Sequence, residues 1–491
     1  MAGLTVKSAA GRWVLLTTVL GSGMTMLDGT VVNVALPKIG RSLHADLASL
    51  QWVLNAYMLT LAGLILLGGA LGDRYGRRRV FIIGAVWFSV ASLLCGLAVN
   101  AEMLIASRAL QGIGGALLMP GSLAIIQATF AEDQRARAIG AWSGLGGIAA
   151  AIGPFLGGWL VDGPGWRWAF LINLPLGVVT VAVAARHVPE NHDPTAHGRF
   201  DVLGAAVGAI SLGAISYALI RAAEGWSVTV AVAAVVGVVM AGSFVWLERR
   251  ERNPMLPLSI FGSRQFSVVN VVTFGIYAAL SGIMFLLGME LQLVSGFSAL
   301  VAGAALVPLT ILMLLLSARS GELTERIGPR IPLSVGPVFC AGGVLMMLRI
   351  GPSANYWADV LPAVLVLGIG MVLLVAPLTA TVLAAAPVEH AGVASGVNNA
   401  VARAAGLIAV AALPLVAGSA ARDALGPGFD TVFQRGVWVC AALMAVSAGI
   451  AWAGVRNPDA AARAKAPEPQ CKVNCAAQAP PLETTGAAAQ R

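Results

Sequence analysis

Apolar runs of roughly 20 residues recur from one end of the chain to the other, and short polar segments separate them. A run of that length crosses a hydrocarbon layer of about 30 Å as an α-helix, and alternating strands of the kind that build membrane barrels are absent from the sequence. The pattern therefore predicts an all-α integral membrane protein with 14 transmembrane helices. They are expected at about residues 12–35, 50–71, 80–99, 104–128, 138–161, 168–186, 201–220, 228–247, 266–290, 298–318, 331–350, 360–384, 396–418 and 433–454.

Charged, proline-containing interruptions divide the predicted helices into two six-helix bundles with two inserted central helices. The first residues are too weakly patterned for a cleavable signal. The last are rich in Ala, Pro and Gln, a composition typical of disorder. The expected parts are a cytoplasmic leader (1–11), an N-terminal bundle (12–186), a cytoplasmic linker (187–200), the inserted helices (201–247), a second cytoplasmic linker (248–265), a C-terminal bundle (266–454) and a disordered cytoplasmic tail (455–491).

The composition agrees with a membrane protein and sets its orientation. Of the 491 residues, 58% are hydrophobic and 11% charged, and the mean hydropathy is +0.83. The net charge of +8 arises from arginines that gather in loops after the even-numbered helices, which predicts that these loops and both termini face the cytoplasm. Basic patches interleaved with aromatic residues are lacking, so nucleic acid is not an expected partner. The five cysteines show no pairing pattern.

A short charged loop after the second predicted helix, GALGDRYGRRR at 69–79, is repeated at 321–330 with a constant offset of 252 residues. The repeat indicates a duplicated architecture whose halves are related as parallel repeats. The residues expected to control conformation are Gly69, Asp73, Arg74, Gly76, Arg77 and Arg78 in the first copy and Gly321, Glu325, Arg326, Gly328 and Arg330 in the second.

Two charged residues lie inside the predicted helices of the first bundle. Asp28 would cost on the order of 3 kcal/mol to insert, so its carboxyl must face a cavity, a partner or a proton. Arg108 lies at a similar depth in the fourth helix and shares a face with Gln111 and Gly112, so the two charges are expected to meet. Two interpretations stay open: a carboxyl that couples transport to protons, and a fixed ion pair that only joins helices.

Two charged residues of the second bundle are further candidates, Glu290 and Arg403. Glu290 is a candidate second protonatable site, and the alternative is a side chain at the lipid headgroups. Arg403 follows two asparagines by about one turn, and the alternative for it is an arginine that snorkels to the cytoplasmic end. Residues suited to an adaptable substrate cavity are Asn33, Gln111, Met26, Met58 and Met119.

The fifth predicted helix carries Gly144, Gly153, Pro154, Gly157 and Gly158. Proline removes an intrahelical hydrogen bond and glycine removes bulk, so this helix is expected to be kinked and thin, able to pack closely and to flex. A kink without a functional role is the alternative.

Signatures of catalysis and of cofactor binding are missing from the sequence. It has no metal-ligand spacing, no paired nucleophile and base, and no phosphate-binding loop, because GGALGDRYG lacks the Gly-Lys-Ser/Thr ending. We therefore expect neither an enzyme nor a cofactor, and no ATP-driven transport by this chain alone.

Taken together, these residues resemble the major facilitator superfamily, specifically its fourteen-helix drug:proton antiporter branch of the multidrug efflux type. The likeness runs from about Trp13 to Trp452. It rests on four motifs that follow one another along the chain. They are LDGTVVNVALP at 27–37, the charged loop at 69–78, the residues Arg108, Gln111 and Gly112 of the fourth helix, and the glycine pattern at 144–158. The second loop copy departs from the pattern, with Glu325 in place of Asp and Pro329 in place of a basic residue, and Glu290 stands where an aromatic residue is expected.

The resemblance implies alternating access by two rocking bundles. It assigns proton coupling to Asp28, charge modulation to Arg108, an exchange-coupling hinge to the fifth helix and a cytoplasmic latch to Asp73, paired with a loop arginine such as Arg135 or Arg137. The expected function is proton-coupled export of hydrophobic or cationic drugs by a monomer in the inner (plasma) membrane, with substrate, protons and lipid as its partners. Two alternatives stay open: export of a dedicated metabolite, lipid or self-made antibiotic, and a non-transporting receptor or scaffold.

Overall fold

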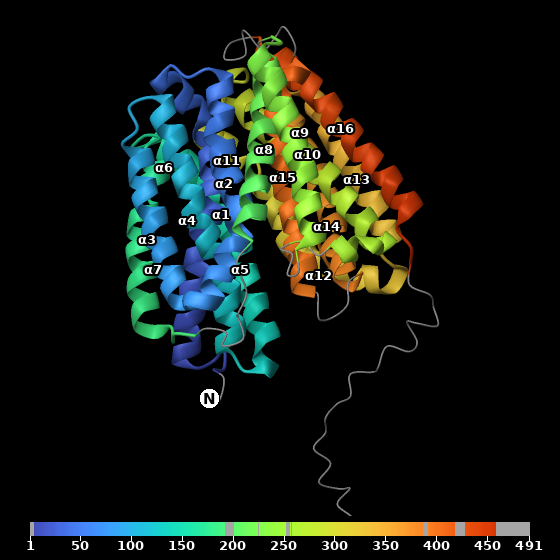
Figure 1. Cartoon of the computed structure of the whole chain (residues 1–491). Helices are drawn as coiled ribbons and strands as arrows, with labels where there is room; N and C mark the ends of the chain where they lie inside the picture. The colour runs from blue at the N-terminus through green and yellow to red at the C-terminus, as the bar shows by residue number, and fades with distance from the viewer. Residues whose placement is uncertain are drawn as a thin grey trace, which may run out of the picture. The chain divides into compact units, whose positions relative to one another are not determined.

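Long α-helices joined by short loops make up the computed structural model, which describes residues 4–191, 201–223, 225–251, 256, 258–385, 391–417 and 428–457 (Figure 1). Within these residues the only β contact is an isolated bridge between Leu4 and Phe130. The prediction of an all-α membrane protein is confirmed. Much of the predicted linker 187–200 and most of the tail 455–491 fall outside the described residues, whereas the predicted linker 248–265 is described except for 252–255 and 257.

The helices follow the predicted order. The first group is α1 (Ala9–Leu43), α2 (Leu47–Tyr75), α3 (Arg77–Gly96), α4 (Ala101–Thr129), α5 (Glu132–Asp162), α6 (Trp168–Leu171) and α7 (Asn173–His187). The inserted pair is α8 (Val202–Ala222) and α9 (Val228–Arg250). The last group is η1 (Leu258–Gly262), α10 (Arg264–Leu293), α11 (Ala299–Ala304), α12 (Val307–Ile327), α13 (Arg330–Met346), η2 (Met347–Arg349), η3 (Tyr356–Val360), α14 (Leu361–Ala384), α15 (Ala391–Ala417) and α16 (Phe429–Gly454).

Among the described residues, 13 helical segments are long and apolar enough to cross a membrane. The helix α5, predicted as a span at 138–161, is not one of them, although it is 31 residues long. The count of 14 therefore stays a prediction.

Prolines split two of the predicted helices. Pro175 has no N–H to donate to Leu171, and α6 ends at Leu171. Pro308 likewise leaves the carbonyl of Ala304 without its helical donor, and α11 ends at Ala304. The single helices predicted at 168–186 and 298–318 are thus each a short helix followed by a longer one.

Polar caps fix where several helices begin. The Asp46 carboxylate accepts a hydrogen bond from the Ser49 amide at 2.8 Å at the start of α2, and Asn100 accepts one from the Met103 amide at 2.8 Å at the start of α4. The predicted boundaries counted only apolar residues, so they start these helices about one turn late.

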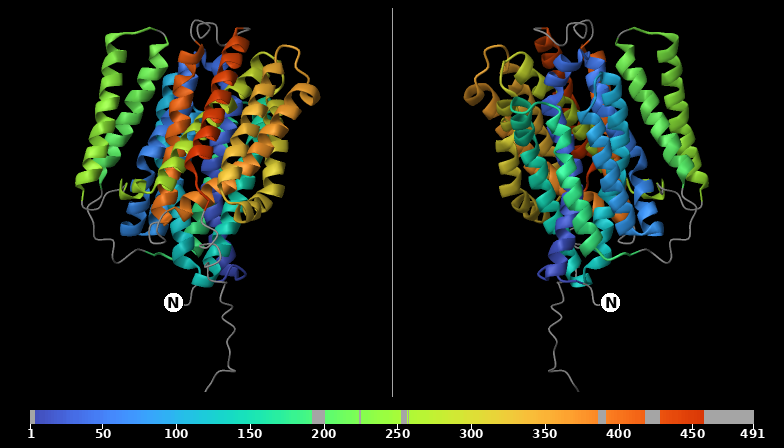
Figure 2. Two further views of the ribbon diagram at one scale, coloured as in Figure 1. Left: turned by 90° about the vertical axis from the view of Figure 1, so that its right-hand side faces the viewer. Right: turned by 90° about the vertical axis from the view of Figure 1, so that its left-hand side faces the viewer.

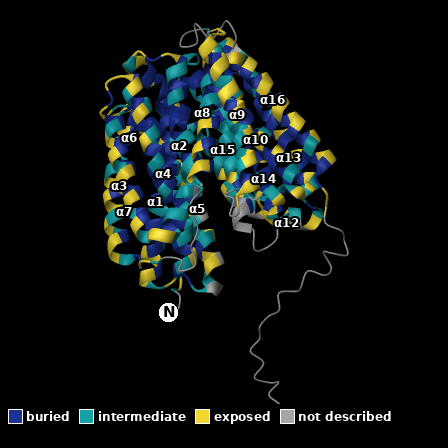
Figure 3. Cartoon of the chain, in the orientation of Figure 1, coloured by how far each residue is buried: buried dark blue, intermediate teal, exposed yellow. Residues whose placement is uncertain are grey.

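The inserted helices lie beside both groups of helices. The helix α8 packs on α2 and on α15, and α9 packs on α8; Figure 2 shows the pair side by side at the edge of the molecule. The outward side of α9 carries the exposed valines Val232, Val235 and Val239 (Figure 3). An exposed apolar face on a membrane helix fits contact with lipid.

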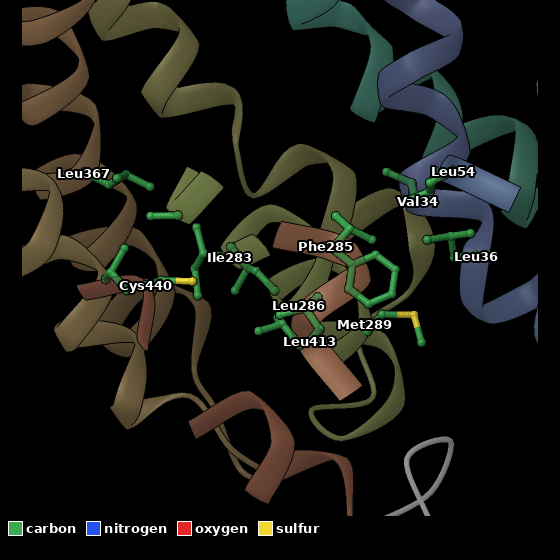
Figure 4. Close-up of a cluster of buried hydrophobic side chains, with 14 of the residues drawn as sticks. Val34, Leu36, Leu54, Ile283, Phe285, Leu286, Met289, Leu367, Leu413 and Cys440 are labelled. Atoms are coloured by element: carbon green, nitrogen blue, oxygen red, sulfur yellow. The ribbon is translucent and has the colours of Figure 1, made fainter. Parts of the chain in front are cut away.

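The two halves of the chain touch near the ends of α1 and α10, where α2 and α11 begin; we name this the outer end, since the charge bias predicts it to face outside. Three hydrogen bonds between the halves lie toward this end. Gln51 Nε2 donates to Val410 O at 2.8 Å, Gln292 Nε2 donates to Val34 O at 3.1 Å, and Leu300 N donates to Asp162 at 2.8 Å. The same region holds an apolar cluster that includes Val34, Leu36, Leu54, Phe285 and Met289 (Figure 4).

Glycines let α4 approach its neighbours closely. A Cβ atom on Gly114 would lie 2.7 Å from Phe88 N and 2.8 Å from Phe88 Cα, so the α3 backbone leaves no room for one. Gly112 meets the backbone of α2 at Tyr57 in the same way. The glycines of α4 therefore lie where this helix packs against α2 and α3.

We expect Gly114→Ala to destabilise the protein by about 1–3 kcal/mol, because the α3 backbone cannot move aside as a flexible side chain would. The measurement is the midpoint of thermal unfolding in detergent.

The matched control is Gly242→Ala in α9, where an added Cβ meets nothing within 4 Å. It should leave the midpoint unchanged or raise it, since alanine favours a helix more than glycine does. Equal midpoints for the two variants would contradict the close packing of α4.

Candidate functional site

The charged centre of the first half is an ion pair between Asp28 of α1 and Arg108 of α4. Arg108 Nη1 lies 2.5 Å from Asp28 Oδ2, and both side chains are fully buried. Arg108 Nε also donates to Val53 O of α2 at 3.0 Å, and its guanidinium lies 4.2 Å from the centre of the Tyr57 ring. The structure thus brings together the two charged residues that were predicted to lie at a similar depth in the membrane.

Neutral polar side chains complete this network. Gln111 Nε2 donates to Asp28 Oδ1 at 2.8 Å and lies 2.8 Å from Ser92 Oγ, while Gln111 Oε1 accepts from Arg108 Nη1 at 2.6 Å. Asn173 Nδ2 of α7 donates to Asp28 Oδ1 at 3.3 Å. As a carboxylate, Asp28 therefore accepts hydrogen bonds from three donors, which lie in α4 and α7. The donors are in turn held by Val53 of α2 and Ser92 of α3.

A cavity of about 350 Å³ lies next to this network, between the two halves. From the first half it is lined by Gly29, Asn33, Leu54, Asn55, Tyr57, Met58 and Arg108, and from the second by Tyr277, Leu280, Ser281, Met284, Phe285, Asn399, Ala402, Arg403, Gly406, Leu407 and Val410. Its size and its mixture of apolar walls with a few polar groups suit a small organic molecule.

The predicted cavity residues divide into two sets. Asn33 and Met58 line the cavity. Gln111 lies behind it in the Asp28 network, and Met26 faces α5, with its sulfur 3.3 Å from the Cβ position of Gly146. Met119 is not among the lining residues, but its sulfur accepts a hydrogen bond from Arg403 Nη2 at 3.1 Å.

Arg403 contributes to the cavity wall from α15. The alternative of an arginine that snorkels to the cytoplasmic end is wrong, because its guanidinium reaches across to Met119 of the first half. Among the described residues its Nε atom has no hydrogen-bond partner and no carboxylate pairs with it.

Glu290 lies in α10, away from the Asp28 network. Its side chain is fully buried, so the alternative of a carboxylate exposed at the headgroups is wrong. Neither carboxyl oxygen has a hydrogen-bond donor among the described residues. The charged group that acts on it is Asp430 in the first turn of α16, and Asp430 accepts from Gln434 Nε2 at 2.9 Å.

Ion pairs and a hydrogen bond hold the first charged loop in place. Asp73 pairs with Arg77 at 2.8 Å within the loop, and not with Arg135 or Arg137 as the resemblance implied. Arg78 Nη1 donates to Val188 O at 3.2 Å and its Nε lies 3.5 Å from Glu190, just after the end of α7. The start of α3 is thereby held to the residues that follow α7, the last helix of its half.

The second copy repeats this anchoring. Arg330, which corresponds to Arg78, donates from Nε to Trp452 O of α16 at 2.8 Å and lies 4.5 Å from the Trp452 ring. Gly76 and Gly328 both adopt positive φ, 107° and 84°, a conformation that favours glycine. An added Cβ at Gly321 would meet nothing within 4 Å, and the Glu325 side chain lies outside the described part of the chain.

The glycine helix α5 lies between the two halves. Gly157 meets Val31 of α1, with Val31 Cα 3.0 Å from its Cβ position, and Gly153 meets Thr30 of the same helix. Gly158 meets Ala299 and Leu300 of α11, and the carbonyl of Pro154 lies against Gly303. A Cβ atom added at Gly144 would meet no other atom within 4 Å.

Sequence reasoning missed Ser92, Asn173, Asn55 and Tyr57. Two signals were available. Gln51 and Asn55 stand four residues apart in an apolar helix and so share one face, and Asn173 stands just before the proline that breaks its span. Ser92 carries no such signal, because a lone serine is common in membrane helices.

Comparison with known proteins gives the family. The family model of the Major Facilitator Superfamily matches residues 18–202 and 178–410. The multidrug resistance protein Stp of Mycobacterium tuberculosis (strain CDC 1551 / Oshkosh) is 37% identical over 79% of this chain and 72% of its own length. The probable actinorhodin transporter of Streptomyces coelicolor (strain ATCC BAA-471 / A3(2) / M145) is 37% identical over 80% of this chain and 70% of its own length.

The fold agrees with solved structures. A bacterial homologue of the human lysosomal transporter Spinster aligns with a TM-score of 0.63 at 17% identity, covering 92% of this chain and all of that one. The family match, the named relatives and the membrane-spanning helices together make this chain a multi-pass cell-membrane transporter and not an enzyme. The chain belongs to the Major Facilitator Superfamily.

Proposed function

We propose that this transporter exports small antibiotic-like molecules in exchange for protons. The observation that carries the proposal is the buried Asp28 carboxylate, which is held by three donors and whose partner Arg108 lines the central cavity. A carboxylate buried in a membrane protein is expensive and by default marks a functional site.

The mechanism follows from the charge of Asp28. As a carboxylate it holds Arg108 against α1. A proton on Asp28 removes that attraction and releases the guanidinium, which also lines the cavity. The protonation of Asp28 and the occupancy of the cavity therefore act on the same arginine.

The range of substrates has two candidate forms. One relative is named as a multidrug resistance protein and another as the transporter of a single antibiotic. Both fit the same proton-coupled machinery. A dedicated metabolite or lipid, or an antibiotic that the host itself makes, remains the alternative substrate class, and we propose that the chain acts as a monomer.

Replacing Asp28 by Asn should slow proton-coupled exchange by roughly a hundredfold or more, the size of effect expected when a positioned proton-transfer group is lost. The measurement is proton-driven uptake of a fluorescent substrate into inverted vesicles. The single variant also leaves Arg108 buried without a counter-charge, a loss of about 3–5 kcal/mol in stability.

The double variant Asp28→Asn, Arg108→Gln is the control for that loss, because it removes both charges together. It should fold better than the single variant and still fail to couple substrate to protons. Normal coupling in the double variant would mean that the pair only joins helices.

We propose further that α5 and α11 form the contact that closes the outer end, since Gly158 and Gly303 bring their backbones together there. The charged loop that holds Asp73 and Arg74, together with its second copy at 321–330, would set the balance between open and closed conformations at the end opposite the outer end. Their anchors Arg78 and Arg330 hold corresponding helices.

Gly158→Val should push the halves apart at the outer end, because a Cβ there would lie 2.5 Å from Leu300 Cα. A strain of about 1–3 kcal/mol shifts the ratio of open to closed states roughly 5- to 150-fold. Spin labels on the exposed residues Val99 and Trp357, one in each half, would report a longer distance.

Gly144→Val in the same helix is the matched control, since nothing lies within 4 Å of its Cβ position. It should leave the labelled distance as in the parent protein. An unchanged distance in Gly158→Val would remove α5 from the closing contact.

Glu290 is proposed as a second proton site. It faces Asp430, and two carboxylates are acceptors only, so the two side chains can hydrogen-bond to each other only when one of them holds a proton. Such a pair shares a proton for the same reason that two close carboxylates cannot both ionise.

Glu290→Gln supplies an amide that can donate to Asp430 permanently, so the fold should persist while one exchangeable proton is lost. We expect fewer protons to be released per substrate bound, measured in weakly buffered detergent solution with a pH dye. The exposed carboxylate Glu102, changed to Gln, is the control and should leave the ratio unchanged. The same ratio in Glu290→Gln as in the wild type would exclude this site.

A further inference from the structure

The charges that line the central cavity are of one sign. Arg108 and Arg403 are its only charged lining residues, and no carboxylate borders it among the residues described. Asp28 is fully buried behind Arg108 and is already satisfied by Arg108, Gln111 and Asn173. Because Asp28 balances Arg108, the uncompensated charge of the cavity is that of Arg403.

Arg403 is held weakly where it stands. Its Nη2 atom donates to the sulfur of Met119, which is a poor acceptor, and its Nε atom has no partner among the described residues. An arginine keeps its charge at any physiological pH, so burial cannot neutralise it. The guanidinium is therefore free to turn toward a better acceptor.

A second donor stands across the cavity. Asn55 of α2 lines it, and Asn55 Nδ2 has no acceptor among the described residues. Tyr57 and Met58 from the first half and Tyr277, Met284 and Phe285 from the second supply the apolar and aromatic walls. The cavity thus pairs a fixed cation and an unused amide donor with surfaces that suit a flat ring system.

We propose that the cavity binds organic anions, namely aromatic compounds that carry a carboxylate or an acidic phenol, with Arg403 as the counter-charge. The inference deepens the proposed export function and rests on it for the direction of transport. It replaces the cationic substrates expected from the sequence, since a cation in this cavity would meet Arg403 and find no carboxylate.

The test is equilibrium binding of three matched fluorescent probes to the full-length chain in detergent at pH 7. The probes are 9-anthracenecarboxylate, its neutral carboxamide and the cation 9-(aminomethyl)anthracene, which share one ring system. We expect the carboxylate to bind about tenfold or more tightly than the carboxamide, as a charge-assisted hydrogen bond in a buried site allows, and the amine to bind most weakly.

Arg403→Gln should abolish the preference for the carboxylate over the carboxamide, and continued binding of the carboxamide shows that the variant is folded. Arg403→Lys, which keeps the charge, should recover part of the preference. Arg349→Gln is the control, since Arg349 is exposed and pairs with Asp359 at 3.6 Å; it should bind as the wild type does.

Equal affinity of the wild type for carboxylate and carboxamide, tightest binding of the amine, or an unchanged preference in Arg403→Gln would each overturn the proposal. These outcomes are independent of proton coupling, because no gradient is present. Failure of the Asp28 variants to affect exchange, with the carboxylate preference intact, would instead reject the export mechanism alone.

Discussion

The buried ion pair of Asp28 and Arg108 constrains the first half of this transporter more than any other contact. Two charges removed from water are stabilised only if each finds further hydrogen bonds, because desolvation offsets much of their attraction. The donors come from α4 and α7, and the acceptor for Arg108 Nε comes from α2. The mutual positions of these helices and α1 therefore follow from keeping one carboxylate satisfied.

The two halves share a scaffold and differ in chemistry. Arg78 and Arg330 anchor corresponding helices, and Gly76 and Gly328 make the same positive-φ turn before them. Among the described residues of the second half, no buried arginine–carboxylate ion pair corresponds to that of Asp28 and Arg108. What this half contributes to the cavity is a single charge, Arg403. The repeated loop and its anchors are therefore shared by the halves, while the charges placed at the cavity differ between them.

The sequence predicts the fold because its apolar runs are long enough to span a membrane as helices. It predicts the site because a charged residue inside such a helix is costly and must have a partner or a role. Asp28 and Arg108 could be paired in advance because each is expensive alone and both lie at one depth. Asn173 and Ser92 could not, since neutral polar residues carry little cost and their partners depend on packing. Asp73 was assigned a distant arginine, yet Arg77 lies only four residues along the chain, just beyond the turn at Gly76, and pairs with it there. Glu290 lacked a predicted partner because Asp430 is 140 residues further along the chain.

Alternating access requires strong contacts within each half and weak contacts between them, and the hydrogen bonds divide in that way. Inside the first half, side chains bind side chains in a fully buried network. Between the halves, Gln51 and Gln292 each reach a backbone carbonyl, and a backbone amide reaches Asp162. Where α5 meets α11, Gly158 and Gly303 each lie directly against the backbone of the other helix. Separating the halves at the outer end therefore breaks a few hydrogen bonds that water can replace, whereas separating α1 from α4 would expose an unpaired charge. The proposed rocking of the bundles would therefore leave the Asp28 network intact and open only the contacts between the halves.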